Sequence, residues 1–240
     1  MVQKHQDKGA VVTDIAHIFK AGKERNIIYA WFPAMHTRVD IVIVSERDEM
    51  SLLYVISDIF HLMGVLERKG NCFDPDSELS KYNAGELKQD QLDDELRHIL
   101  SLCEKWKQAT NGLFDAAVEG KYNLSGFLKG YCLDRIHSLL ATEGIADALI
   151  NMGNSSVMAL GSQSERRGWP IVNPETGKKV VLYNECLTTS GNDSQERYHI
   201  IDPMTKRYVR GKRVVSVITP TGTEGEVRSI EKFIKTHNNG

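Results

Sequence analysis

Residues 38–68 read RVDIVIVSERDEMSLLYVISDIFHLMGVLER, and this stretch decides the fold class. Residues 39–44 alternate in part and end in a continuous apolar run, which is typical of a strand. From Asp48 to Arg68 the apolar residues recur at helical spacing, which predicts an amphipathic helix. A strand followed directly by a helix with one wide apolar face predicts a sheet with helices packed on it.

The rest of the chain extends this pattern in both directions. Helical spacing predicts further helices over 87–109, 127–142 and 224–235, and a strand is predicted over 27–32. From residue 146 onward the predicted elements are strands, at 146–152, 156–160, 169–172, 179–183, 197–201 and 214–219. We therefore expect an α+β fold, with helices mainly in the first half and an antiparallel β-rich second half. We expect a single domain over 1–240, with a short helix over 11–21 at its periphery.

Composition excludes several classes of protein. The chain has 240 residues, 30 Lys and Arg against 32 Asp and Glu, and a formal net charge of −2. We expect no nucleic-acid partner, because the charge balance gives no broadly basic surface. We expect no membrane span, because no apolar run reaches roughly 18 residues. The N-terminus lacks the apolar segment of a signal peptide, so the protein is cytoplasmic or an exported form whose signal has been removed. The four cysteines show no metal-binding spacing and are expected to be free thiols.

Polar clusters stand at the boundaries of the predicted elements, and the residues alone leave two readings for each. Residues 76–83 either hold a ring with hydrogen-bonding edges or form a capped turn between helices. Asp115, in the cluster 110–115, is either a site residue or a cap. Lys129, in 126–131, either reaches a phosphate at a helix start or is an exposed first-turn lysine. The hydroxyl-rich loop 188–193 and the following His199 form a site, or His199 is an ordinary strand histidine. Four clusters at element ends favour one shared cleft.

These clusters, in this order, resemble the ApbE family of FAD:protein FMN transferases. Ala34-Met35-His36-Thr37 resembles the family's AMGT, and residues 77–83, SELSKYN, match its SELSxxN segment. Residues 110–115, TNGLFD, resemble TxGxFD, and residues 123–134, NLSGFLKGYCLD, resemble DLGGIAKGYAVD. Residues 151–154, NMGN, resemble NxGG, while 189–191, TSG, and 199–205, HIIDPMT, match TSG and HIIDPxTG.

The resemblance implies an ApbE fold, similar to the T-fold, built around one flavin-binding cleft. It implies an enzyme that takes FAD as substrate, requires Mg²⁺, and transfers FMN to a Thr or Ser hydroxyl of an acceptor protein with release of AMP. Acceptors in the family are typically subunits of membrane redox pumps.

The resemblance also implies roles for individual residues. His199, Asp202 and Lys129 are the expected catalytic residues. His199 would accept or steer the proton of the incoming hydroxyl, and Lys129 would offset pyrophosphate charge. The expected magnesium ligands are the Leu128 carbonyl, Glu226 and Ser229. The residues expected around FAD are Met35, Ser77, Glu78, Leu79, Asn83, Asp115, Lys129, Gly153, Ser190, His199 and Thr205.

The chain departs from the family pattern at several of these positions. Residues 225–230 read GEVRSI where the family has an ADALSTA-type segment, so Glu226 stands for the Asp and Ile230 for the Thr. Because Mg²⁺ demands tight octahedral oxygen geometry, two alternatives stay open beside the transferase. One is a flavin-binding protein with impaired catalysis, and the other is an FAD pyrophosphatase that releases FMN and AMP.

Overall fold

The computed structural model describes residues 15–163, 167–192 and 199–238. Its centre is a seven-stranded sheet in the order β1-β2-β3-β4-β5-β8-β11, and every neighbouring pair is antiparallel. These strands are β1 (Ala16–Lys20), β2 (Asn26–Ala34), β3 (Thr37–Ser45), β4 (Asp147–Met152), β5 (Ser156–Leu160), β8 (Glu185–Asn192) and β11 (Arg213–Thr219). The sheet therefore joins strands from both halves of the chain.

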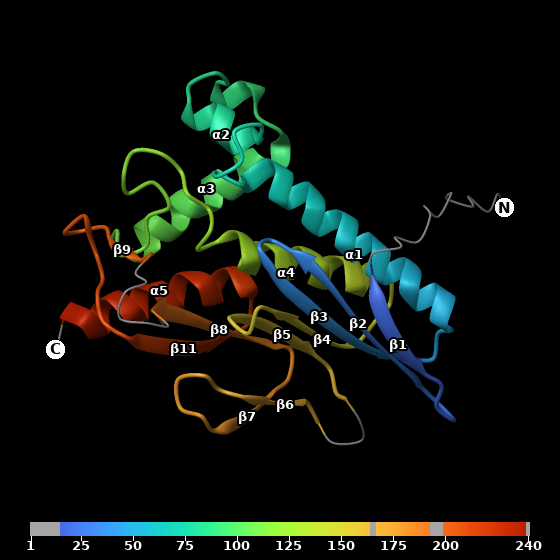
Figure 1. The fold of residues 1–240 in the computed structure, drawn as a ribbon. Coiled ribbons are helices and arrows are strands. Elements are labelled where there is room, and N and C mark those ends of the chain that lie inside the picture. The colour runs from blue at the N-terminus through green and yellow to red at the C-terminus, as the bar shows by residue number, and fades with distance from the viewer. Residues whose placement is uncertain (1–14, 164–166, 193–198, 239–240) are drawn as a thin grey trace.

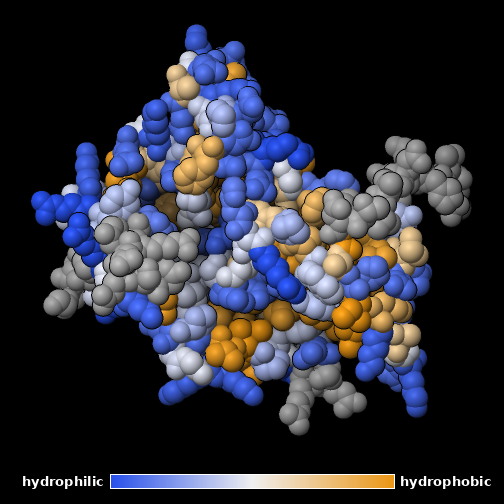
Figure 2. All heavy atoms as spheres, viewed as in Figure 1, coloured by the Kyte–Doolittle hydropathy of each residue, from blue (hydrophilic) through white to orange (hydrophobic). Residues whose placement is uncertain are grey.

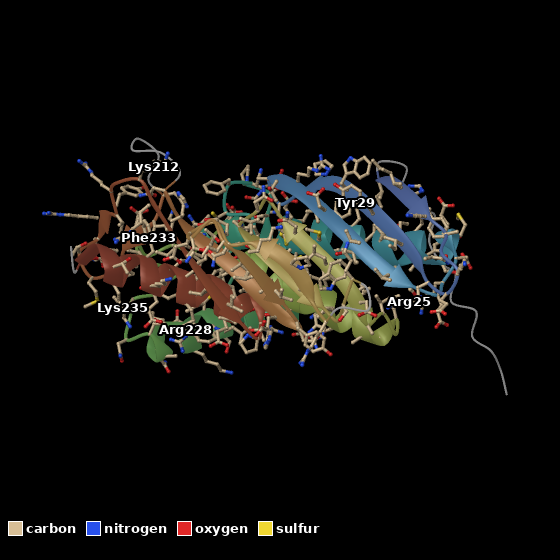
Figure 3. All side chains as sticks on the ribbon, turned by 90° about the horizontal axis from the view of Figure 1, so that it is seen from below. Arg25, Tyr29, Lys212, Arg228, Phe233 and Lys235 are labelled. Carbon is tan, nitrogen blue, oxygen red and sulfur yellow. The ribbon has the colours of Figure 1, made fainter. Side chains whose placement is uncertain are left out.

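The helices lie on one side of this sheet, and α2 and α3 stand farther from it than α1, α4 and α5 (Figure 1). They are α1 (Glu49–Gly70), α2 (Glu78–Asn83), the 3₁₀ turn η1 (Gln89–Gln91), α3 (Asp94–Ala109), α4 (Leu128–Thr142) and α5 (Gly222–Asn238). Helix α1 packs against β2 and α4, whereas α5 packs against α4, β8 and β11. Viewed from below, Arg25 and Tyr29 lie toward the α1 end of the molecule, and Phe233 and Lys235 toward the α5 end (Figure 3). The expected α+β fold is confirmed.

Helix α1 shows why the opening stretch is decisive. Asp48 caps its start, because the carboxylate accepts a hydrogen bond from the Ser51 N–H at 2.8 Å. By length and composition, α1 is also apolar enough to cross a membrane. In the fold, its apolar face is buried in the core, where Leu52, Ile56 and Ile59 are fully covered. The core therefore accounts for its apolar character.

Two small hairpins flank the sheet. The hairpin of β6 (Trp169–Val172) and β7 (Lys179–Leu182) covers the face opposite the helices, where Trp169 packs in an apolar cluster with Val157 and Leu187. Apolar side chains gather on the lower part of the molecule around this hairpin (Figure 2). The second hairpin, of β9 (Ile201–Asp202) and β10 (Arg207–Tyr208), lies near the C-terminal part of α5.

The structure corrects the predicted helix over 11–21. Its described part contains the edge strand β1, where Lys20 pairs with Ile27 and Ala16 with Trp31. Ile18, expected on the buried helical face, is 61% exposed. Pairing with the edge of β2 satisfies backbone hydrogen-bonding groups of β1. This stabilisation by a neighbouring strand outweighs the weak helical spacing of the apolar residues.

Other boundaries also differ from the predictions. Residues 188–192 are not a loop but the last part of β8. Helix α3 begins at Asp94 rather than at residue 87, because Asp93 caps it by accepting a hydrogen bond from the Glu95 N–H at 2.8 Å. In the predicted strand 197–201, residues 197 and 198 lie outside the described residues, and strand β9 starts only at Ile201.

Candidate active site

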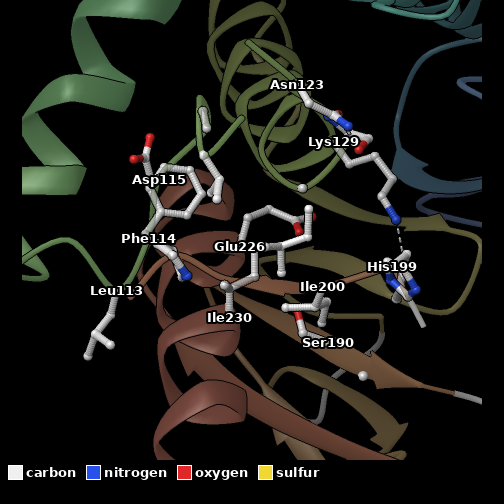
Figure 4. Close-up of a pocket in the computed structure, with 18 of the residues that line it drawn as sticks. Leu113, Phe114, Asp115, Asn123, Lys129, Ser190, His199, Ile200, Glu226 and Ile230 are labelled. Carbon is white, nitrogen blue, oxygen red and sulfur yellow. Dashed lines mark hydrogen bonds between the residues drawn. The ribbon is translucent and has the colours of Figure 1, made fainter. Parts of the chain in front are cut away.

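A cleft of about 510 Å³ opens between the N-terminal turn of α4, helix α5, the loop 113–126 and the segment 199–203. Figure 4 shows Lys129 on one side of it, Phe114 and Asp115 on the other, and Glu226 and Ile230 rising from α5 between them. Of the residues predicted to form a site, the structure brings Asp115, Lys129, Gly153, Ser190, His199 and Glu226 together in its lining.

A close crossing of α4 and α5 fixes the floor of the cleft. A Cβ atom at Gly130 would lie 2.2 Å from the Gly222 carbonyl oxygen, so only glycine allows this approach. Asp134 of α4 also caps the start of α5, since its carboxylate accepts hydrogen bonds from the N–H groups of Gly222 (2.6 Å) and Thr223 (2.9 Å). These contacts set the position of Glu226 relative to Lys129. Asp134 lies in the segment 123–134 that resembles a family motif, but the sequence alone predicts no role for it.

Lys129 and Glu226 are a lysine and a buried acid that both line the cleft. The Lys129 ammonium donates to the Ser155 hydroxyl at 2.5 Å, and the Glu226 carboxylate accepts from the Ser156 hydroxyl at 2.6 Å. Glu226 is only 4% exposed. Burial raises the pKa of Glu226, while the Lys129 charge and the Ser156 hydrogen bond act in the opposite direction. The lysine whose charge acts on this acid is thus the one expected to meet phosphate.

Hydroxyl groups of β8 face α5 beside this pair. Ser190 lies 2.7 Å from Ser229, hydroxyl to hydroxyl, and Ser229 also donates to the Glu226 carbonyl at 3.0 Å. Thr189, which also lines the cleft, bonds Ser216 at 2.8 Å. The hydroxyl-rich segment predicted as a loop is part of a strand, and neighbouring elements satisfy the hydroxyls of Thr189 and Ser190.

The opposite wall combines an aromatic ring with a carboxylate. Phe114 packs against Phe127 with ring centroids 5.7 Å apart. Asp115 pairs with Lys107 at 2.8 Å and accepts from the Ala117 N–H at 2.8 Å, so both of its oxygens are held. The hydrogen bond from Lys107 to Asp115 raises the pKa of that lysine. The sequence predicts Asp115 as a site residue but not Phe114, which also lines the cleft. The position of Phe114 next to Asp115 in the segment 110–115 is the feature that could have indicated it.

His199 is exposed and lines the cleft beside Ile200 and Ile201. Asp202 is buried and accepts a hydrogen bond from the Met204 N–H at 2.9 Å, which fixes the turn after β9. Thr205 lies exposed in that turn and is not part of the cleft lining. Of His199, Asp202 and Thr205, the structure therefore brings only His199 into the cleft lining. Asp202 instead holds the turn that follows β9.

The segment 77–83 lies outside the cleft lining. Ser77 caps α2 by accepting from the Ser80 N–H at 3.0 Å, and Glu78 accepts from the Asp93 N–H at 2.5 Å. Leu79 is fully buried in the apolar core, and Asn83 exchanges two 2.8 Å hydrogen bonds with the Tyr122 backbone. Within the described residues, this segment thus forms a capped helix that braces the loop before α4.

Met35 also lies apart from the cleft lining, in the turn between β2 and β3. Met35 and His36 both have positive φ, 50° and 57°, and the Met35 N–H donates to Glu67 at 2.9 Å. Gly153, by contrast, lines the cleft at φ +62°, where a Cβ atom would fall 2.1 Å from the Thr37 hydroxyl. Glycine is required there by both conformation and space.

The donors in the cleft can be tested against a magnesium ion. Among the described residues no group of three or more His, Cys, Asp or Glu could hold a metal. Ile230 offers no ligand atom, and the Ser229 hydroxyl is engaged with Ser190. Glu226, a lining carboxylate on which the Lys129 charge acts, remains as a candidate ligand. This set fits Mg²⁺ when substrate phosphates and water complete the shell, which is how proteins commonly bind this ion.

A cation, a buried acid, hydroxyls and an aromatic wall in one cleft define an α+β protein suited to an anionic ligand with a ring system. The chain belongs to the ApbE family, whose sequence model matches residues 35–127 and 119–239. It is 35% identical over 115 residues to an FAD:protein FMN transferase of Rhodobacter capsulatus. That match covers 42% of this chain and 21% of the relative, so it spans about a fifth of the relative's length.

Solved structures show the same fold. The flavin transferase ApbE from Vibrio cholerae superimposes with a TM-score of 0.71 at 16% identity, covering 86% of each chain. The ApbE protein from Thermotoga maritima gives a TM-score of 0.74 at 20% identity, covering 89% of this chain and 88% of that one. The apo form of the Pseudomonas stutzeri flavinyl transferase ApbE gives 0.75 at 16% identity, covering 86% and 83%. At these identities the likeness concerns the fold alone.

Proposed function

We propose that this protein is an FAD:protein FMN transferase that depends on Mg²⁺ and modifies a Thr or Ser hydroxyl of an acceptor protein. The observation that carries the proposal is the convergence of Lys129, Glu226 and His199 on one cleft with an aromatic wall. Membership of the ApbE family and the partial likeness to a named transferase support it.

The reaction is a phosphoryl transfer in which positioning and charge neutralisation do most of the work. The acceptor hydroxyl oxygen forms a bond to the phosphorus of the FMN half. The bond from that phosphorus to the bridging oxygen breaks, and AMP leaves with the electron pair. The hydroxyl proton passes to the imidazole of His199.

The remaining residues of the cleft bind and orient the substrate. Lys129, in the first turn of α4, offsets phosphate charge, and the helix dipole favours anions at the same place. Phe114 and Ile230 supply apolar contact for a flavin ring. Glu226 would hold the metal, with the Leu128 carbonyl and Ser229 close by in sequence as further candidates. A bound divalent ion supplies charge stabilisation to the phosphates.

A labelling experiment tests the transferase. The purified protein is incubated with FAD, Mg²⁺ and several candidate acceptor domains, and covalent FMN is sought by mass spectrometry. We expect a mass increase of one FMN on a Thr or Ser of one acceptor, together with free AMP. If no acceptor is labelled while an active homologue labels its own acceptor in parallel, the proposal is wrong.

A second candidate is a flavin-binding protein with impaired transfer. It is favoured by Ile230 in the cleft wall and by the Ser229 hydroxyl being held by Ser190. FAD titrations with and without Mg²⁺ distinguish the two. Tight binding that ignores Mg²⁺, with no AMP formed, supports impaired transfer. FMN and AMP formed without any acceptor would instead indicate an FAD pyrophosphatase.

A further inference from the structure

A basic segment borders the cleft on the side of His199. Residues 206–213 read KRYVRGKR, and all five of their cationic residues are exposed. We call this set the basic rim: Lys206, Arg207, Arg210, Lys212 and Arg213. Its backbone is anchored, because Val209 is buried and the Asn192 amide donates to the carbonyls of Val209 (2.8 Å) and Gly211 (3.1 Å).

The basic rim is built into the structure that lines the cleft. Arg207 pairs across the β9–β10 hairpin with Asp202, and Tyr208 pairs with Ile201, which lines the cleft. Arg213 immediately precedes Val214, another lining residue. Hydrophilic side chains project from this end of the molecule (Figure 2), and Lys212 lies there, far from Arg25 and Tyr29 (Figure 3). A macromolecule that reaches into the cleft from this side meets the rim first.

The charge of the rim is only partly balanced within the chain. Within the part of the chain that the structure describes, the side chains of Lys206, Arg207 and Lys212 form no ion pair or hydrogen bond. From Asp193 to Arg213 the sequence holds six Lys and Arg against three Asp and Glu, although the whole chain is at −2. The positive charge is therefore local, and it stands beside the site rather than over the surface in general.

We propose that the basic rim binds an acidic surface segment of the acceptor protein and so guides its hydroxyl to the cleft. This inference rests on the proposed transferase function. FAD is a weaker explanation of the rim, because its phosphates must reach Lys129 inside the cleft, whereas the rim cations are exposed outside it. Complementary rim charges typically set encounter rate and partner choice, which is what an enzyme acting on a protein requires.

A binding assay tests the rim without needing catalysis. The probes are a fluorescent peptide with one Thr flanked by Asp and Glu, and the same peptide with Asn and Gln in their place. We expect the acidic peptide to bind about tenfold more tightly at low salt, with the difference shrinking as salt shortens the Debye length to about 8 Å at physiological ionic strength. Lys206→Glu with Lys212→Glu should abolish the preference.

A matched control uses Lys178 in the β6–β7 turn and Lys179 at the start of β7, on the far face of the sheet. Lys178→Glu with Lys179→Glu changes the net charge by the same amount and should keep the preference. Equal binding of both peptides by the unaltered protein, or equal loss in both double variants, overturns the proposal. Co-sedimentation with phosphatidylserine vesicles in the absence of any peptide preference would also overturn it, in favour of a membrane surface.

Labelling kinetics separate this inference from the proposed function. With the acidic peptide as acceptor, the rim variant should raise KM for the peptide about tenfold and leave KM for FAD unchanged. A KM for FAD that rises equally contradicts the assignment to the acceptor. Peptide binding without any labelling would refute the transferase while leaving the acidic-segment site standing. Labelling without charge preference would refute the rim alone.

Discussion

The face of the sheet that the helices cover carries different kinds of side chain at its two ends. Under α1 the fully buried positions of the face are apolar, whereas under α5 the face carries buried hydroxyls, one of which donates to the Glu226 carboxylate of that helix. One cross-strand row shows the change, since Phe32 pairs with Val39, Val39 with Met152, Met152 with Ser156, and Ser156 with Thr188. The row passes from a phenyl ring to a hydroxyl without a break in register. The fold thus separates the part that supplies stability from the part that supplies chemistry.

The largest effect is expected from breaking the apolar end. Ile41 is fully buried under the helices, so Ile41→Ala should lower the free energy of unfolding by about 2–5 kcal/mol, measured by urea denaturation. The flavin-transfer rate per folded molecule should stay unchanged. Ile18→Ala on exposed β1 is the control and should shift stability by less than about 0.5 kcal/mol. A loss of transfer rate in the folded Ile41 variant would contradict the separation of the two ends.

The polar end should give the converse result. Lys129→Met should lower the transfer rate about 10²–10³-fold, because it removes a fixed charge that stabilises the transition state. Its melting temperature should stay close to that of the unaltered protein. Lys105→Met, an exposed lysine of α3, serves as the control. If Lys129→Met unfolds the protein, the ammonium serves the fold rather than the reaction.

Glu226 links stability at the polar end to pH. Burial raises the pKa of Glu226 in the folded protein above the ordinary value of 4.5. The resulting contribution to the free energy of unfolding is therefore complete below pH 4.5 and is lost as pH rises through the pKa of the folded state. Glu226→Gln keeps the shape and an acceptor for Ser156 but cannot ionise. In a buffer with a chelator, the variant should therefore gain stability relative to the unaltered protein as pH rises. A difference in unfolding free energy that does not vary with pH would refute this.

The smallest effect concerns Thr188. Its buried hydroxyl has no hydrogen-bond partner among the described residues, and it lies against Gly225 of α5. Thr188→Val should leave the unfolding free energy unchanged or raise it by about 1 kcal/mol, because an unpaired polar atom is replaced by a methyl group. Ser156→Ala is the contrasting variant, since it removes a made hydrogen bond to Glu226 and should destabilise. A clear decrease in the unfolding free energy of Thr188→Val would mean that the hydroxyl binds a group that the fold requires.

Elements with a strong pattern of their own were the easier part to predict from sequence. Helix α1 is recognisable by its helical period and its capping residue, and the strands 156–160 and 169–172 are predicted with the bounds that the structure gives. Strand β1 escaped prediction because its stability comes from pairing with β2 rather than from its own pattern. Strand β8 escaped because Thr188, Thr189 and Ser190 look like a loop until their partners on β11 and α5 are known.

The sequence allowed several residues of the site to be predicted, but not how they are arranged in space. Resemblance to a family selected Lys129, Ser190, His199 and Glu226, which the structure brings to one cleft, although their roles stay predictions. It equally selected the segment 77–83, whose residues serve a capped helix and the core. Nothing in the sequence distinguishes a conspicuous polar cluster that braces a fold from one that lines a cleft, because the distinction is made by distant segments.

The crossing at Gly130 and Gly222 has a consequence for how such a site can change over time. Because backbone meets backbone there, the spacing between the two helices is set by peptide geometry and not by side-chain volume. Neighbouring positions such as 226, 229 and 230 can then accept new residues without altering the distance across the cleft. The scaffold keeps its dimensions while the chemistry that it presents is free to drift.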